Sequence, residues 1–284
     1  MAYPVVQAVS TWALAGTGNA TDWGEITLPS GIAAGDLLLA LVAADGQPDL
    51  VGSPAWHRLK TERNSNAVTA AVFWRIADGS ADALAITSSA SERGTAIVYR
   101  ISGANLVEGA AANGSSANST PAAASASHAG RDYLWVAVRG GDANVVATLA
   151  PSGYGDLISL ADGTTAGASL NTAYKTGTAA EEAPGPWTVA SEQWATFTLA
   201  VYQAPRLAGT VRDASGDPLA ADLLVIDRAA RGLYTHNEYD APLRSGADGI
   251  FSLGMHGPSA AYSLLALDPT GLRRDLLVTR VEPV

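Results

Sequence analysis

The stretch "GDLLLALVAADG", residues 35–46, decides how the first two thirds of the chain fold. Eight consecutive apolar residues, 37–44, stand between a Gly-Asp pair and an Asp-Gly pair, which is typical of a short buried β-strand. This is the longest apolar run in the chain, and it is far shorter than the ~20 residues that a membrane-spanning helix needs. We therefore expect a strand here and no membrane insertion.

Similar short apolar or alternating segments follow one another along the chain, each bounded by Gly, Pro, Asn, Asp or Ser. The 29 glycines and 14 prolines fit a fold with many turns, and helical periodicity is hard to find. The pattern predicts an all-β sandwich or barrel. In the first 204 residues the expected strands are 5–11, 22–27, 37–44, 67–76, 83–87, 95–101, 134–139, 156–160, 169–175, 187–190 and 195–202.

The opening stretch has a counterpart in "RDYLWVAVRGGD", residues 131–142, and the blocks that follow each stretch have the same order. Three pairs align the two copies: Asp36 with Asp132, Trp74 with Tyr174, and Tyr99 with Tyr202. Such a repeat predicts two similar groups of strands that face each other in a jelly-roll-like sandwich. The segment 108–130, rich in Ala, Ser and Asn, is expected to be a long edge crossover between the copies.

A domain boundary is expected at "YQAPRLAG", where the strand pattern ends at a proline. We predict a jelly-roll-like β-sandwich over residues 1–204, with an anchoring or oligomerising role, and a smaller Ig-like β-sandwich over 205–284. The second domain begins with "LAGTVRDASGDPLAADLLVIDR", residues 207–228, in which two apolar segments flank a turn. This order predicts a β-hairpin.

The second domain resembles the carboxypeptidase-regulatory, transthyretin-like family of β-sandwiches over residues 207–278. The similarity is carried by "GTVRDASGDPL", by "DGIFSL" at 248–253 and by "YSLLALD" at 262–268. Members of this family are mostly non-catalytic appended modules, so the resemblance implies a spacer or binding module without an active site.

The first domain is similar to a module common in structural proteins of tailed bacteriophages. The similarity lies in "LPSGIAAGDLLLALVAADG", "AVFWRIADGS" and "ITSSASERGTAIVYRISG", in that order. Together, the two resemblances imply a fibre, spike or minor tail protein that acts in assembly or in attachment to the host surface. They also imply other virion proteins as partners and a homo-oligomer such as a trimer.

Charge and composition reduce the number of functional classes to which the protein could belong. The net charge of −10, with no run of basic residues, argues against nucleic-acid binding. The start "MAYPVVQAVSTWALAG" lacks a basic region followed by an apolar core, so we expect no secretory signal, synthesis in the host cytoplasm and a final place in the virion. With no cysteine, disulfides and thiolate metal sites are excluded.

No constellation in the sequence predicts catalysis, a cofactor or a metal. The four histidines have no metal-binding spacing, no Gly-x-Ser-x-Gly elbow occurs, and the carboxylates Glu181 and Glu182 would point to opposite faces of a strand. Asp213, Asp217 and Asp222 could suit calcium but lack an EF-hand spacing, and we take them as the polar residues of a turn. We therefore expect a protein that is not an enzyme.

Two sets of residues are candidates for binding. The polar loop 232–245 offers Tyr and Arg, which are frequent in binding hot spots, and the candidate residues are Tyr234, His236, Asn237, Tyr239 and Arg244. Trp56 and Trp187 lie beside expected turns, where an indole either stacks on a sugar or packs in the core. The alternative function that follows is a bacterial carbohydrate-binding protein or adhesin with a transthyretin-like module, and a host-surface glycan is a possible partner in both cases.

Overall fold

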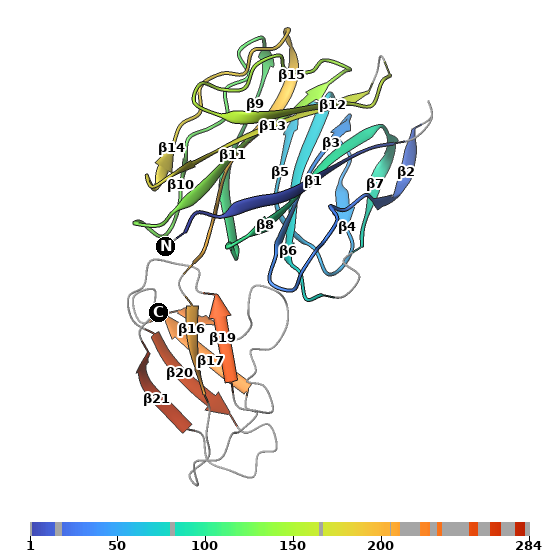
Figure 1. Ribbon diagram of the computed structural model, residues 1–284. Helices are drawn as coiled ribbons and strands as arrows, with labels where there is room; N and C mark the ends of the chain where they lie inside the picture. The colour runs from blue at the N-terminus through green and yellow to red at the C-terminus, as the bar shows by residue number, and fades with distance from the viewer. Residues whose placement is uncertain are drawn as a thin grey trace. The chain divides into compact units, whose positions relative to one another are not determined.

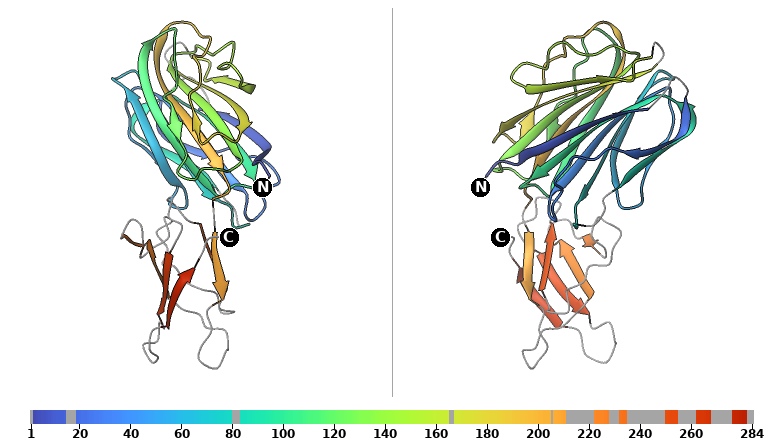
Figure 2. Two further views of the ribbon diagram at one scale, coloured as in Figure 1. Left: turned by 90° about the vertical axis from the view of Figure 1, so that its left-hand side faces the viewer. Right: turned by 45° about the vertical axis from the view of Figure 1, so that its right-hand side comes forward.

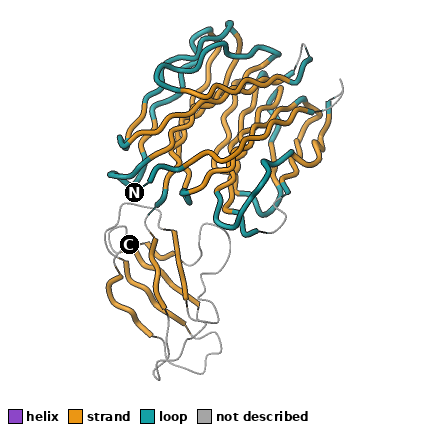
Figure 3. The backbone as a smooth tube through the Cα atoms, in the orientation of Figure 1, coloured by secondary structure: helices purple, strands orange, loops and turns teal. Residues whose placement is uncertain are grey.

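The chain forms two compact units, Met1–Gln203 and Ala204–Val284. The computed structural model describes residues 2–14, 19–79, 83–164 and 167–204, and beyond them the backbone of 206–210, 222–227, 232–234, 250–254, 262–267 and 276–281. All regular structure in these residues is β-strand, so the expected all-β sandwich class is confirmed (Figure 3).

Two five-stranded antiparallel sheets make up most of the first unit, and they face each other (Figure 1; Figure 2 gives two other views). The first sheet has the order β1 (Val5–Ala13), β8 (Gly94–Ser102), β3 (Leu37–Asp45), β6 (Val68–Ile76) and β5 (His57–Asn64). The second sheet has the order β12 (Gly155–Ala161), β13 (Ala168–Gly177), β11 (Tyr133–Asp142), β15 (Glu192–Tyr202) and β9 (Leu106–Ser116).

The central strands of the two sheets come very close together. A Cβ atom on Gly140 of β11 would lie 3.2 Å from the Cβ of Ala43 and 3.1 Å from that of Ala70, so glycine permits the contact. Further along the interface, the hydroxyl groups of Tyr99 and Thr172 are 2.6 Å apart and fully buried. The interior of the sandwich is therefore a tight contact between the two sheets.

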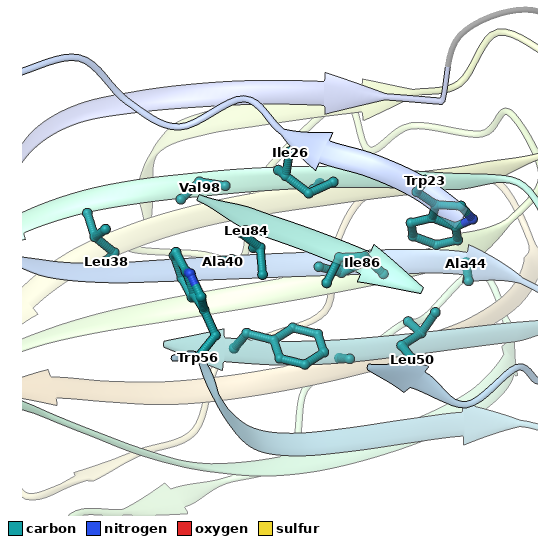
Figure 4. Close-up of a cluster of buried hydrophobic side chains, with 14 of the residues drawn as sticks. Trp23, Ile26, Leu38, Ala40, Ala44, Leu50, Trp56, Leu84, Ile86 and Val98 are labelled. Carbon is teal, nitrogen blue, oxygen red and sulfur yellow. The ribbon is translucent and has the colours of Figure 1, made fainter. Parts of the chain in front are cut away.

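The outer face of the first sheet is also covered. A three-stranded sheet of β2 (Ala20–Ile26), β7 (Leu84–Glu92) and β4 (Leu50–Gly52) lies over it and encloses a cluster that contains Leu38, Ala40 and Leu84 (Figure 4). Strand β3 is consequently buried on both faces, which is why its sequence is a continuous apolar run instead of an alternating one.

A thinner layer covers the outer face of the second sheet. It contains the two-stranded pair β10 (Ala124–Ser125) and β14 (Glu181–Glu182), and Trp187, which packs against Ala137 and Ala173. Strand β11 is therefore buried on both faces, like β3.

The strand order is the same in the two halves of the first unit. The first sheet has the order β1-β8-β3-β6-β5, and the second sheet, read from its other end, has the order β9-β15-β11-β13-β12. In each half the first strand of the chain pairs with the last one: β1 pairs with β8, and β9 pairs with β15. Ala43 and Gly140, which meet between the sheets, serve as corresponding positions of the two central strands. Leu39 then corresponds to Val136, and their partners Trp74 and Tyr174 correspond to each other, as the sequence predicts.

The other two aligned pairs are not equivalent. Leu39 pairs with Tyr99 while Val136 pairs with Leu199, so Leu199 and not Tyr202 corresponds to Tyr99. Asp36 and Asp132 are shifted by one residue under the same register. Similar residue types near a strand end are a weak basis for aligning two repeats. An alignment that is wrong by one residue assigns every side chain of the strand to the opposite face of the sheet.

Several expected strands differ from those observed. Strands β4, β5, β9, β10 and β14 were not among the predicted ones, and the expected strand 187–190 forms only a single bridge, Leu149 with Thr188. The first nine residues of the segment expected as a crossover, 108–116, belong to the eleven-residue edge strand β9 (Leu106–Ser116).

The second unit contains two small sheets. One pairs β16 (Arg206–Thr210) with β19 (Ile250–Gly254), and the other has the order β18 (Gly232–Tyr234), β17 (Asp222–Asp227), β20 (Tyr262–Leu267) and β21 (Leu276–Val281). The predicted hairpin is wrong, because β16 and β17 belong to different sheets. Residues 211–221 separate them, which exceeds the roughly 2–5 residues of a usual hairpin loop.

Candidate functional site: the acidic end of the first unit

Charged side chains gather where the central strands of both sheets end. Asp45 is the last residue of β3 and Asp142 the last of β11, and the shared register makes them equivalent positions of the repeat. Each lies two residues beyond the close contact of Ala43 with Gly140, which brings the two carboxyl groups near enough to share a hydrogen bond when one of them is protonated. Two acids from different halves of the unit therefore meet at one point.

Two glutamates repeat this arrangement beside the aspartates. Glu92 is the last residue of β7, two residues before β8 begins, and Glu192 is the first residue of β15, which is the strand that corresponds to β8 in the second repeat. Glu192 forms an ion pair with Arg139, whose side chain is fully buried and whose Nε donates to Ser119 at 3.1 Å. The name acidic end is used below for Asp45, Glu92, Asp142, Asp162 and Glu192 together with Arg93 and Arg139.

A second arginine joins the two repeats at this end. The Nε of Arg93 lies 2.7 Å from Oδ2 of Asp162, and the exposed fractions of the two side chains are 1% and 0%. Arg93 also donates to the carbonyl of Leu14 at 2.7 Å, and its own carbonyl accepts the amide of Asp45 at 3.0 Å. The five acids and two arginines of the acidic end leave an excess of negative charge when all are ionised.

Burial and mutual repulsion change the acidity of these groups. Burial, followed by the charges of Glu92 and Asp142, raises the pKa of Asp45 to about 6. Burial also raises the pKa of Glu92 and of Asp142. For Glu192, burial raises the pKa to about 7 although Arg139 opposes the shift. The acidic end can therefore take up a proton near neutral pH.

A shallow hollow of about 370 Å³ opens beside these groups and is lined by Ser65, Asn66, Ala67, Asp142 and Gln193. Its rim includes unusual backbone, since Ser65 has φ of 48° and Ala143, directly after Asp142, has φ of 133°. Among the described residues, no group of three or more His, Cys, Asp or Glu side chains is arranged to hold a metal ion. The chemistry that the acidic end offers is proton uptake and release.

A second polar cluster lies near the end of β15. The hydroxyl of Tyr202 donates to Glu108 at 3.0 Å and lies 3.1 Å from Nδ1 of His128, while the Ser127 hydroxyl donates to Glu108 at 2.5 Å. The serine hydroxyl is thus bonded to a carboxylate and not to an imidazole, so this is not the arrangement of an activated nucleophile. The contacts fasten the segment before β11 to the edge of the second sheet.

The two tryptophans expected as sugar-stacking candidates are in the core. Trp56 is 5% exposed, belongs to the cluster in Figure 4 and donates from Nε1 to the Ala83 carbonyl at 3.2 Å. Trp187 is 2% exposed and packs in the outer layer of the second sheet. Neither indole leaves a ring face open to stack on a sugar, so of the two alternatives both tryptophans adopt core packing.

The remaining candidates lie mostly outside the described residues. Tyr234 is the last residue of β18, but His236, Asn237, Tyr239 and Arg244 are outside them, as are Asp213 and Asp217. Glu182 pairs with Lys175 at 2.8 Å, whereas the neighbouring Glu181 is exposed.

Sequence reasoning did not single out the acidic end. One signal was available, because both copies of the repeated apolar strand, "LLLALVAAD" and "YLWVAVRGGD", end in aspartate. Equivalent acids of two facing repeats meet at the same end of a sandwich. The glutamates and the arginine partners carry no comparable signal.

The chain matches no protein-family model, and comparison with curated proteins and with solved structures also finds no match. Within the described residues, no helix is long and apolar enough to cross a membrane.

Proposed function

We propose that this chain is a non-enzymatic structural component of a tailed-phage-like particle, of the fibre, spike or minor tail type. It is made in the host cytoplasm and assembled into the virion. The first unit anchors the chain and self-associates, for instance as a trimer, and the second unit contacts a neighbouring virion protein or the host surface.

The proposal is supported by buried polar contacts that connect the two repeats of the first unit. Arg93 with Asp162, Tyr99 with Thr172 and the Asn64 amide with the Gly114 carbonyl all join one repeat to the other. Buried polar groups of this kind help to specify one arrangement of the two sheets and make it rigid. A rigid particle component needs this property.

Immunogold electron microscopy tests the proposal. Particles released from cells that produce this chain are labelled with antibodies against the first unit, and particles from cells lacking the gene serve as the control. Regular labelling at one position supports the proposal. A protein that stays entirely in the particle-free fraction, with unchanged particles in the deletion strain, refutes it.

The recognition role of the second unit rests on its Tyr- and Arg-containing loop, 232–245. A triple alanine variant of Tyr234, Tyr239 and Arg244 is expected to assemble into particles but to adsorb less well to host cells. If adsorption and assembly are both unchanged in a folded variant, the loop has no contact role.

A further inference from the structure

Asp45 and Asp142 lie at the ends of two strands that are in close contact. Ala43 and Gly140 hold β3 and β11 in contact two residues before Asp45 and Asp142, so the two carboxyl groups start close together and separate either by side-chain rotation or by movement of a strand end. The amides of Asp45 and Gly46 are bonded to the carbonyls of Arg93 and Ala67 at 3.0 and 2.9 Å, which fastens this strand end to β8 and to the β5–β6 turn. On the other side, Ala143 continues the chain from Asp142 with φ of 133°, a conformation that non-glycine residues rarely adopt.

We propose that Asp45 and Asp142 form a proton-operated latch, which joins the ends of β3 and β11 while the pair holds a proton and loosens them when both carboxyls ionise. Two carboxyl groups in hydrogen-bond contact need a proton between them, because two carboxylates offer only acceptors and repel each other. The latch is a property of the first unit and does not depend on the proposed particle function.

The charges around the pair favour this behaviour. Glu92 at the end of β7 adds a third negative charge, and Glu192 at the start of β15 faces Asp142. The positive charges at this end, Arg93 and Arg139, lie in ion pairs with Asp162 and Glu192. Asn64, the last residue of β5, and Ser65 and Asn66 of the following turn are polar neighbours that carry no charge.

The sign of the effect follows from the direction of the shift. The pKa of Asp45 is raised in the folded protein from 3.8 to about 6, so the folded state holds this proton more tightly than the unfolded chain does. The stabilisation is complete below pH 4 and is lost as the pH rises through about 6. Glu192, with its pKa raised to about 7, contributes in the same direction, so the test must separate the two groups.

Site-resolved NMR of the full chain provides the first measurement. The side-chain carboxyl carbons of Asp45 and Asp142 are followed between pH 3 and 9, and we expect the pair to titrate in two steps, the later one near pH 6. Protection of the Asp45 and Gly46 amides against hydrogen exchange, corrected for intrinsic rates, should fall across the same step, while Leu39 in the middle of β3 stays protected. Titration of both carboxyls below pH 5, or unchanged protection across the step, overturns the proposal.

Thermal unfolding of matched variants gives the second measurement. Between pH 5 and 7.5 the wild-type Tm should fall by on the order of 2–4 °C more than that of D45N, since asparagine supplies the bridging hydrogen at every pH. D142N provides the same test from the other side if D45N does not fold. The control E25Q removes an exposed carboxylate of β2 and should keep the wild-type slope. A slope in D45N and D142N equal to that of E25Q overturns the latch and attributes the pH dependence to Glu192.

Discussion

Arg93 and Asp162 form an ion pair that is removed from water. Both side chains are buried, and Asp162 also accepts hydrogen bonds from the amide and hydroxyl of Thr164 at 2.9 Å each. Burial alone would raise the pKa of Asp162, but these donors lower it below its ordinary value. The carboxylate is therefore a fixed charge at neutral pH, in contrast to Asp45 nearby.

We expect Arg93→Ala to destabilise the first unit by ~3–5 kcal/mol, because it leaves the Asp162 carboxylate buried without its counter-charge. The matched control is Arg58→Ala, which removes a 43% exposed arginine from its pair with Asp49 and should cost ~1 kcal/mol or less. Urea unfolding followed by tryptophan fluorescence measures both, since all seven tryptophans lie in the first unit. Equal losses in the two variants would show that burial of the pair does not matter.

Gly94 gives a second prediction at this scale. A Cβ at this position in β8 would overlap the ring of Trp23, so Gly94→Ala should cost ~1–3 kcal/mol through displacement of the indole. Gly155 in β12 is the matched control, because a Cβ there meets nothing within 4 Å. The same urea experiment should place Gly155→Ala close to wild type, and a Gly94→Ala variant as stable as that control would contradict the packing.

At the scale of elements, Trp56 lies in the turn between β4 and β5 and packs into the core beneath the outer sheet β2-β7-β4. We expect Trp56→Ala to lower the free energy of unfolding by ~3–5 kcal/mol, since it empties a large buried volume. Leu149→Ala, at a 62% exposed position, should change the stability by less than ~0.5 kcal/mol. A glycan array adds an independent check: saturable sugar binding that disappears in a folded Trp56→Ala variant would contradict the buried placement.

The elements also show how far the sequence could predict this fold. Strands β3, β6, β8, β11 and β15 lie in the middle of the sheets, and their apolar runs could be recognised because both faces are buried. Edge strands lack this signal. β5 reads "HRLKTERN", with charges that suit an exposed edge, and β9 reads "LVEGAAANGSS", whose small side chains resemble a loop.

The candidate site was less accessible to sequence reasoning than the fold. Its aspartates end two recognisable strands, yet their meeting depends on the register of two sheets, and one aligned pair, Tyr99 with Tyr202, suggested a different register. Trp56 and Trp187 were ambiguous from the start, because an indole beside a turn has the same local sequence whether it points inward or outward. Only the three-dimensional structure distinguishes an inward-pointing indole from an outward-pointing one.

For the whole molecule, we expect limited proteolysis to cut the chain between residues 203 and 207 and to leave two resistant fragments, one for each compact unit. Mass spectrometry of the products identifies the cut, and a melting curve of the larger fragment should reproduce the tryptophan-monitored transition of the full chain. A single resistant fragment that spans residue 204 would contradict the division into two units.

The strand order of the first unit has a consequence for its synthesis. The first sheet is complete only when Ser102 pairs with Val5, and the sheet that covers its inner face is encoded entirely by residues after 105. At about 5–20 residues per second, a ribosome needs roughly 5–20 s to make those next ~100 residues. During this interval Leu37, Leu39 and Leu41 present an uncovered apolar surface on the nascent chain. Growth at a lower temperature and chaperones that shield emerging polypeptides should therefore raise the yield of soluble protein more than a mutation that stabilises the finished sandwich.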